Sequence, residues 1–304
     1  MQNQDEFYIG YLPKAPKKIS GSLKLIIFLL MLIMAFVAFM VVANEEKFDE
    51  STFEYGKLTE LKGVIVKHPV PMLKVKMGID PDKKEVYRSF ILVNFGKMGV
   101  YELVDDLASK MDEPLDQYEV TVQGTLIYFD GKTLLELSNQ SASIINFEKR
   151  DGTEPVSNFL TLQEEAILQG EIIDPKCYFG VMKPGFGKVH RSCAVRCISG
   201  GIPPVLMMKD KQGEMNYVLL TDYGWGPINQ KILDKVGKAV RISGQLQSVD
   251  DWYVLKVNEA KAISLLEDPI HWGKDVYSNL VVDFQNSGKH TCPYHPEMSI
   301  SLCQ

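Results

Sequence analysis

Apolar residues follow two different patterns along this chain. Residues 25–43 are nineteen consecutive uncharged, almost wholly apolar positions (LIIFLLMLIMAFVAFMVVA), whereas beyond residue 57 apolar and polar residues alternate in short runs bounded by Gly and Asp. A continuous run of this length, at about 1.5 Å rise per residue, makes a helix of about 28 Å, close to the ~30 Å hydrocarbon core of a bilayer. Alternation with period two indicates β-strands. The pattern predicts a mainly β protein behind a single N-terminal transmembrane helix.

Charge on the two sides of the apolar run predicts its orientation. Four lysines (Lys14, Lys17, Lys18 and Lys24) precede it, and acidic residues such as Glu45 and Glu46 follow it. Lysines accumulate on the cytoplasmic side of membrane spans. We therefore expect residues 1–24 in the cytoplasm, residues 25–43 across the cytoplasmic (inner) membrane as a single pass, and the rest outside, in the periplasm. The alternative is a cleaved signal peptide, but this run is longer than the 7 to 15 residues usual for one.

The exported part of the chain is acidic. Of 33 basic and 39 acidic residues, four and two respectively lie in the first 44 positions, so 29 basic residues face 37 acidic ones in the remainder. A negatively charged domain repels phosphate backbones. We expect no nucleic-acid partner; the expected partners are the membrane and a membrane protein complex.

The β-rich part contains an internal repetition. LKGVIV at 61–66 recurs as LQGEII at 168–173, FILVNFG at 90–96 as YVLLTDYG at 217–224, and VTVQGTL at 120–126 as VRISGQL at 240–246, in the same order. Each copy also contains one short helical pattern, at 101–111 and at 228–236. The alternative is that two unrelated strand-rich segments look alike.

Strands, a short helix, a glycine-bearing strand and a hairpin form a pattern that resembles the OB-fold superfamily of small five-stranded barrels. The resemblance predicts two OB-like β-barrels in tandem, at 57–150 and 163–266, each with a short helix, and a C-terminal tail at 267–304. Because this fold serves many functions, the resemblance implies no ligand.

The second copy carries an insertion. Gly63 and Phe90 are 27 residues apart, whereas the matching Gly170 and Tyr217 are 47 apart, and the extra residues hold three of the five cysteines. Long loops of this kind often carry function. We therefore expect a functional site in this insertion.

The insertion contains a candidate metal site. His190, Cys193 and Cys197 are spaced i, i+3 and i+7, which places them on one face of a helix over 189–198, and Cys177 can approach them. Three thiolates and an imidazole suit copper or zinc. Three alternatives stay open. The first is a disulfide from Cys177 that staples the loop in an oxidising compartment, and the second is a thiol pair that cycles between reduced and oxidised forms. The third is an anion-recognising surface formed by Arg191 and Arg196.

A second candidate lies in the tail, where CPYHPEM at 292–298 resembles the short heavy-metal-binding motif of copper efflux and transport proteins. The resemblance implies Cys292 and His295 as soft-metal ligands, although Tyr294 replaces the Met of that motif. The alternative is a tail in which Cys292 and Cys303 form a disulfide.

The sequence shows no catalytic motif, so we assign no catalytic residues and favour a binding protein over an enzyme. The first hypothesis is a membrane-anchored, exported accessory protein with a Cys/His copper or zinc site, serving a respiratory or metal-handling membrane complex. The alternatives are a thiol–disulfide redox protein or electron carrier that uses Cys177, Cys193 and Cys197, and a scaffold subunit whose cysteines form stapling disulfides.

Overall fold

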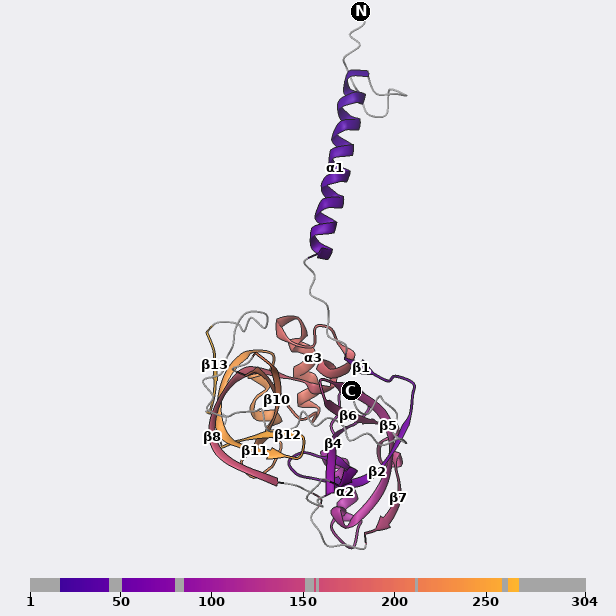
Figure 1. Cartoon of the computed structure of the whole chain (residues 1–304), viewed down its shortest axis with the longest axis vertical. Coiled ribbons are helices and arrows are strands. Elements are labelled where there is room, and N and C mark those ends of the chain that lie inside the picture. The colour runs from indigo at the N-terminus through magenta and orange to yellow at the C-terminus, as the bar shows by residue number, and fades with distance from the viewer. Residues whose placement is uncertain are drawn as a thin grey trace, which may run out of the picture. The chain divides into compact units, whose positions relative to one another are not determined.

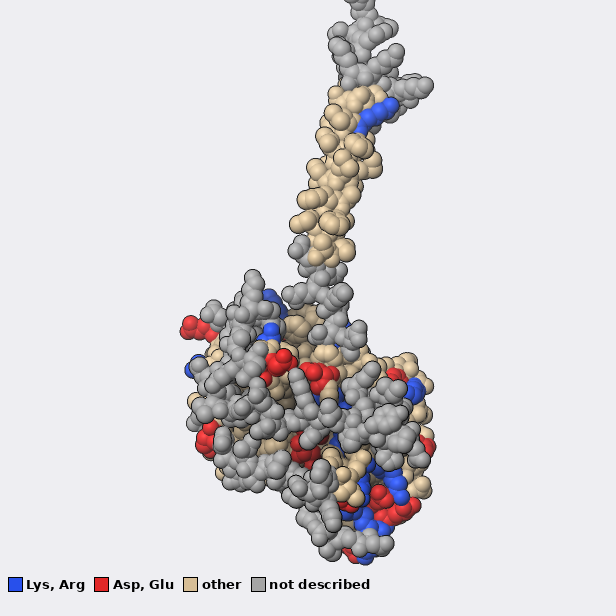
Figure 2. Space-filling model, viewed as in Figure 1, with Lys and Arg blue, Asp and Glu red and all other residues tan. Residues whose placement is uncertain are grey.

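The computed structural model describes residues 17–43, 51–79, 85–150, 156, 159–210, 213–258 and 262–267. It divides the chain into two units, Met1–Asp49 and Glu50–Gln304. The first unit contains helix α1, Lys17–Ala43. Ile19–Ala43 is long and apolar enough to cross a membrane, and no residue of its most apolar stretch is buried within the protein. The visible surface of this helix is almost free of charge (Figure 2). It suits a membrane anchor, and a signal sequence has the same properties.

The second unit begins with a closed five-stranded barrel (Figure 1). Its strands pair in the order β5-β2-β3-β4-β6, and β5 pairs again with β6 to close the ring. The five strands are β2 (Thr59–Val66), β3 (Met72–Ile79), β4 (Glu85–Val93), β5 (Tyr118–Phe129) and β6 (Lys132–Leu137). Two further strands pair with β5, namely β1 (Thr52–Phe53) and β7 (Ile144–Lys149). Helix α2 (Tyr101–Ser109) and the 3-10 turns η1 (Leu115–Gln117) and η2 (Gln140–Ser143) lie between strands.

A second five-stranded barrel follows, with the same pattern of pairing. Its order is β11-β8-β9-β10-β12, closed by β11 with β12, and its one parallel pair is β10–β12, as β4–β6 is in the first barrel. Its strands are β8 (Phe159–Ile173), β9 (Val205–Lys209), β10 (Met215–Asp222), β11 (Ala239–Val249) and β12 (Trp252–Val257), with β13 (Ile263–Leu265) beside β11.

The predicted fold class is thereby confirmed: the protein is mainly β, with an apolar N-terminal helix and two five-stranded barrels consistent with OB-like domains. In the second barrel, the expected short helix at 228–236 takes the form of two 3-10 turns, η4 (Asn229–Lys231) and η5 (Leu233–Lys235). The turns still bury Ile228, Ile232 and Val236 in the barrel core. The boundaries predicted for the domains, and the reading of the two barrels as a repeat, stay predictions.

Strands β4 and β10 are buried on both faces. In β4, Phe90 and Leu92 belong to the core of the first barrel, while Ile91 and Val93 belong to a separate cluster that also contains residues of the second barrel. Tyr217 and Leu219 of β10 lie in this shared cluster as well, whereas Val218 and Leu220 fill the second barrel. Successive side chains of a strand point to opposite faces. Each of these strands therefore joins its own barrel core to one apolar cluster shared by both barrels.

Buried polar contacts also connect the barrels. Lys74 of β3 forms an ion pair with Asp250, in the turn between β11 and β12, and the two side chains are 0% and 2% exposed. The Ser89 hydroxyl donates to Asp250 Oδ2 at 2.8 Å, and the Ser89 N–H donates to Asp251 Oδ1 at 3.0 Å. Burying charges requires such partners. The relative position of the barrels is thus set by specific contacts as well as by apolar burial.

Candidate metal centre

The inserted segment connects β8 to β9, at a place where the first barrel has only a short link from β2 to β3. It contains Asp174, a five-residue π-helix, η3 (Cys177–Val181), and helix α3 (Gly187–Ser199). Gly187 has φ +74°, a conformation that glycine adopts without strain. Gly200 caps the end of α3 and Gly201, at φ +98°, turns the chain away. The helix predicted over 189–198 is therefore present and begins slightly earlier.

Helix α3 presents its candidate ligand side chains to the protein interior. His190, Ala194, Cys197 and Ile198 are buried, and Cys193 is half-buried. Ala194 and Ile198 pack in the second barrel's core, whereas Cys197 and Cys177 belong to the shared cluster. Residues three and four positions apart share a helix face. Packing of this face against apolar residues brings His190 and Cys197 inside the protein.

A first set of ligand atoms is formed by Cys177, His190 and Cys193, which lie within 4.8 Å of one another. The Sγ atoms of Cys177 and Cys193 are 3.9 Å apart, and both cysteines are reduced. His190 is 3% exposed, and its Nε2 is buried without a hydrogen-bond partner. A buried polar atom without a partner costs free energy unless it binds something. The set therefore offers an imidazole beside two sulfurs, on a residue whose Nε2 has no hydrogen-bond partner.

A second set, Asp174, Cys177 and Cys197, satisfies the same 4.8 Å criterion and shares Cys177 with the first. Asp174 is fully buried; its Oδ1 accepts a hydrogen bond from the Lys176 N–H at 3.0 Å, and its Oδ2 is buried without a partner. The five ligand atoms do not form one set within that distance. The structure thus brings Cys177, His190, Cys193 and Cys197 into one region, arranged as two overlapping groups.

Burial and neighbouring charges set the protonation of these groups. A hydrogen bond with Cys197 raises the pKa of the Cys177 thiol, and burial and the charge of Asp174 raise it further. Burial lowers the pKa of His190, against the opposing effect of Asp174, so the imidazole is neutral at neutral pH. Neutral imidazole is the form that ligates metals. Without a metal, Cys177 is a thiol that a bound cation would deprotonate.

A loop of the first barrel completes the site. Lys97, which follows β4, donates from Nζ to Cys193 Sγ at 2.7 Å and to Cys197 Sγ at 3.6 Å. The hydrogen bond to Cys193 is the main reason that the pKa of Lys97 is raised. An ammonium in this position stabilises thiolate sulfur. The first barrel therefore supplies a positive charge to a site whose ligands come from the second.

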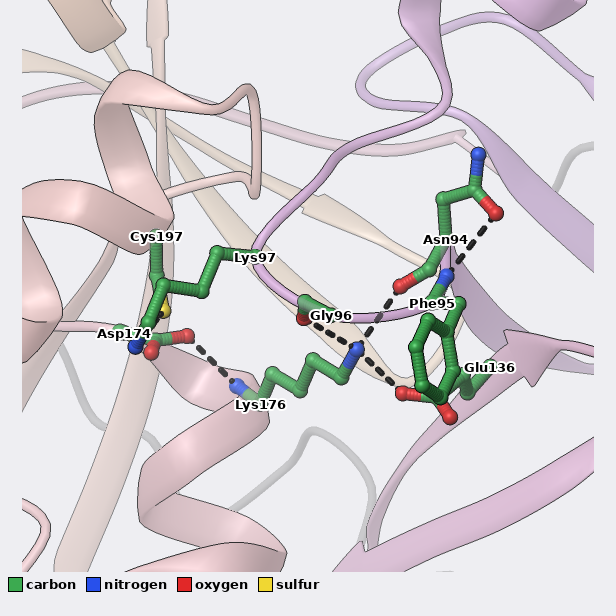
Figure 3. A network of polar contacts seen from close by, with 8 residues as sticks. All are labelled: Asn94, Phe95, Gly96, Lys97, Glu136, Asp174, Lys176 and Cys197. Carbon is green, nitrogen blue, oxygen red and sulfur yellow. Dashed lines mark hydrogen bonds and ion pairs between the residues drawn. The ribbon is translucent and has the colours of Figure 1, made fainter.

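Lys176 holds that loop in place. Its buried Nζ donates to the carbonyl oxygens of Asn94 at 2.7 Å and Gly96 at 2.6 Å and pairs with Glu136 (Figure 3). In the same view, Lys97 extends from this loop toward Cys197 and Asp174. Because Lys176 directly precedes Cys177, the residue that fixes the loop is adjacent in sequence to the central cysteine. Loop and cysteine segment are thereby positioned together.

Glycines allow the loop to approach the end of α3 closely. The Gly99 N–H donates to the Gly200 carbonyl at 2.9 Å. A Cβ at Gly99 would lie 2.0 Å from the carbonyl oxygen of Gly201, and a Cβ at Gly200 would lie 2.0 Å from that of Lys97. No side chain fits at either position without a shift of backbone. The reach of Lys97 to the cysteines depends on this contact.

Sequence reasoning missed Lys97 and Asp174. Asp174 comes directly after β8, three residues before Cys177. Its closeness in sequence to the cysteines could have identified it as a candidate ligand. Lys97 gives no such signal, because it lies in the other barrel. The tail candidates Cys292 and His295 are outside the described residues. Their proposed role as soft-metal ligands stays a prediction.

Comparison of the chain with models of known protein families and with curated proteins gives no match, for the copper-type motif or for any other part.

Proposed function

We propose that this protein is a membrane-anchored, exported binding protein whose second barrel holds copper or zinc on Cys177, His190, Cys193 and Cys197. The observation that carries the proposal is the set of Cys177, His190 and Cys193, with ligand atoms within 4.8 Å of one another and a buried Nε2 without a partner. Sulfur and imidazole ligands in an enclosed site select thiophilic ions. The lysines before the apolar run at 25–43 support a cytoplasmic N-terminus and barrels on the outer side of the inner membrane, where such a site would serve a respiratory or metal-handling complex.

Metal content tests this proposal. The full-length protein is purified in detergent, reduced, loaded with Cu(I) or Zn²⁺ without oxygen, and freed of unbound metal. At least about one equivalent should remain bound. Replacing Cys177, Cys193 and Cys197 by Ser should remove it, while the matched triple variant Cys292→Ser/His295→Ala/Cys303→Ser should keep it. Retention of less than about a tenth of an equivalent by the wild-type protein would overturn the proposal.

A second candidate, a thiol–disulfide redox protein, is favoured by the 3.9 Å between the Sγ atoms of Cys177 and Cys193. Forming the bond requires the sulfurs to approach to about 2.05 Å. The two thiols would then lose two electrons and two protons to glutathione disulfide, which becomes two molecules of glutathione. Equilibration with glutathione buffers measures the potential: a value below about −300 mV identifies a structural bridge and excludes the redox role.

A further inference from the structure

The two ligand sets share one atom, and this shared atom suggests more than one metal ion. Cys177 Sγ lies within 4.8 Å of the ligand atoms of His190 and Cys193, and also within 4.8 Å of those of Asp174 and Cys197. Since the five atoms do not form a single set, one ion at the position of the first set does not reach all of them. A thiolate has several lone pairs, so a sulfur between two ligand groups can bind an ion on each side.

Each set also contains a residue that has a buried atom without a hydrogen-bond partner. His190, 3% exposed, has its Nε2 without one, and Asp174, fully buried, has its Oδ2 without one. Buried polar atoms in native proteins nearly always have partners. One ion bound by the first set alone would not reach Asp174, and one bound by the second alone would not reach His190. Two ions reach both residues.

The charge of the site is compatible with two divalent ions. Thiols that ligate a metal are deprotonated, so with both sets occupied the three cysteines and Asp174 carry four negative charges, which two divalent ions neutralise. Lys97, which contacts Cys193 and Cys197 without a metal, would then turn to solvent. The carboxylate also favours zinc over Cu(I), which prefers softer ligands.

The geometry points to a dinuclear centre in which the Cys177 thiolate bridges two divalent ions of the zinc type, one held with His190 and Cys193 and the other with Asp174 and Cys197. This inference rests on the metal-binding role proposed above. Each ion receives three protein ligands, which leaves the fourth position of a tetrahedral zinc for a small ligand.

Zinc stoichiometry tests the number of ions. All proteins are full length, in detergent and reduced, and all carry Cys292→Ser, His295→Ala and Cys303→Ser, so that the tail contributes no ligands. The reference protein should retain about two equivalents after exposure to a weak chelator, and His190→Ala and Asp174→Asn should each retain about one. Asp174→Asn is a mild change, because an amide oxygen still accepts from the Lys176 N–H.

Cobalt(II) tests the bridge. With the first equivalent, the paramagnetic resonance signal of high-spin Co²⁺ should grow, and with the second it should shrink, because unpaired electrons on two ions that share a sulfur couple and cancel. In His190→Ala, which keeps one ion, the signal should grow and then level off.

The outcomes separate the two proposals. Retention of one zinc by the reference protein, or a cobalt signal that doubles with the second equivalent, overturns the bridged dinuclear centre and leaves the single-metal proposal standing. Retention of less than about a tenth of an equivalent overturns both.

Discussion

Lys97 Nζ lies 2.7 Å from Cys193 Sγ, although the two residues are 96 positions apart and belong to different barrels. The contact exists because Lys176 binds carbonyls of the loop after β4, which contains Lys97. Gly99 and Gly200 also allow the backbone of this loop to contact the end of α3. Cys193 is half-buried, whereas Cys177 and Cys197 are 7% and 1% exposed. Exposure and a neighbouring ammonium both favour a reactive thiol. Among the three cysteines of the insertion, Cys193 is therefore the one open to reagents.

We predict that Lys97→Met slows alkylation of Cys193 at pH 7 by about tenfold, because Cys193 Sγ loses the ammonium that contacts it. Iodoacetamide labelling of reduced protein, followed by peptide mass spectrometry, measures the rate at this residue. Lys110→Met is the matched control, since Lys110, at the end of α2, pairs with Asp106 and its side chain is 67% exposed. Equal rates in wild-type protein and Lys97→Met would contradict the prediction.

The part of this structure that could be predicted from the sequence is the part encoded locally. The apolar run at 25–43 and the alternation along the strands give the helix and the two barrels, since periodicity depends on neighbouring residues. The spacing of His190, Cys193 and Cys197 gives one helix face in the same way. Lys97 could not be found, because its contact depends on how β4 packs in the cluster shared by the barrels. The division into two sets could not be found either, since it depends on where η3 places Cys177.

Gly99→Ala should weaken both fold and site. The added Cβ would meet the Gly201 carbonyl oxygen at 2.0 Å, so the loop or the end of α3 must move. We expect a loss of about 1–3 kcal/mol in unfolding free energy, measured by urea denaturation, together with slower alkylation of Cys193. Gly78→Ala is the control, because a Cβ there meets nothing within 4 Å. Wild-type stability in Gly99→Ala would show that the close approach of the backbones is not needed.

The buried ion pair between Lys74 and Asp250 should be costly to break. Lys74→Met leaves the Asp250 carboxylate buried beside an apolar side chain, so we expect a loss of about 3–5 kcal/mol in unfolding free energy. Lys76→Met, two residues along the same strand, removes a pair with Glu85 in which both side chains are more than 40% exposed, and should change stability by less than about 1 kcal/mol. Similar losses in both variants would contradict a special role for the buried pair.

Asp251 should make stability depend on pH. Burial raises its pKa above the ordinary value of 3.8, so the native state binds its proton more tightly than the unfolded state does. Its contribution to stability is therefore present below pH 3.8 and is lost as pH rises through the raised pKa. In Asp251→Asn, the amide oxygen can still accept from the Ser89 N–H. We predict that this variant gains stability relative to wild type as the pH rises from 3.8 through the raised pKa of Asp251. Denaturation at a series of pH values measures the difference, with the exposed Asp234→Asn as control; a constant difference would contradict the prediction.

The orientation of α1 determines which compartment the candidate site faces. Translocation of four lysines is disfavoured, whereas the acidic residues after the helix have little influence, so the barrels should face outward. A membrane-impermeant maleimide added to intact, mildly reduced spheroplasts of an expressing bacterium should then label the protein. A variant with Ser at Cys193, Cys292 and Cys303 should label much less, because Cys177 and Cys197 are buried. The contrary outcome is that an external control protein is labelled throughout, whereas this protein is labelled only after permeabilisation. The site then faces the cytoplasm. Thiols stay reduced there, so the disulfide alternatives lose their support.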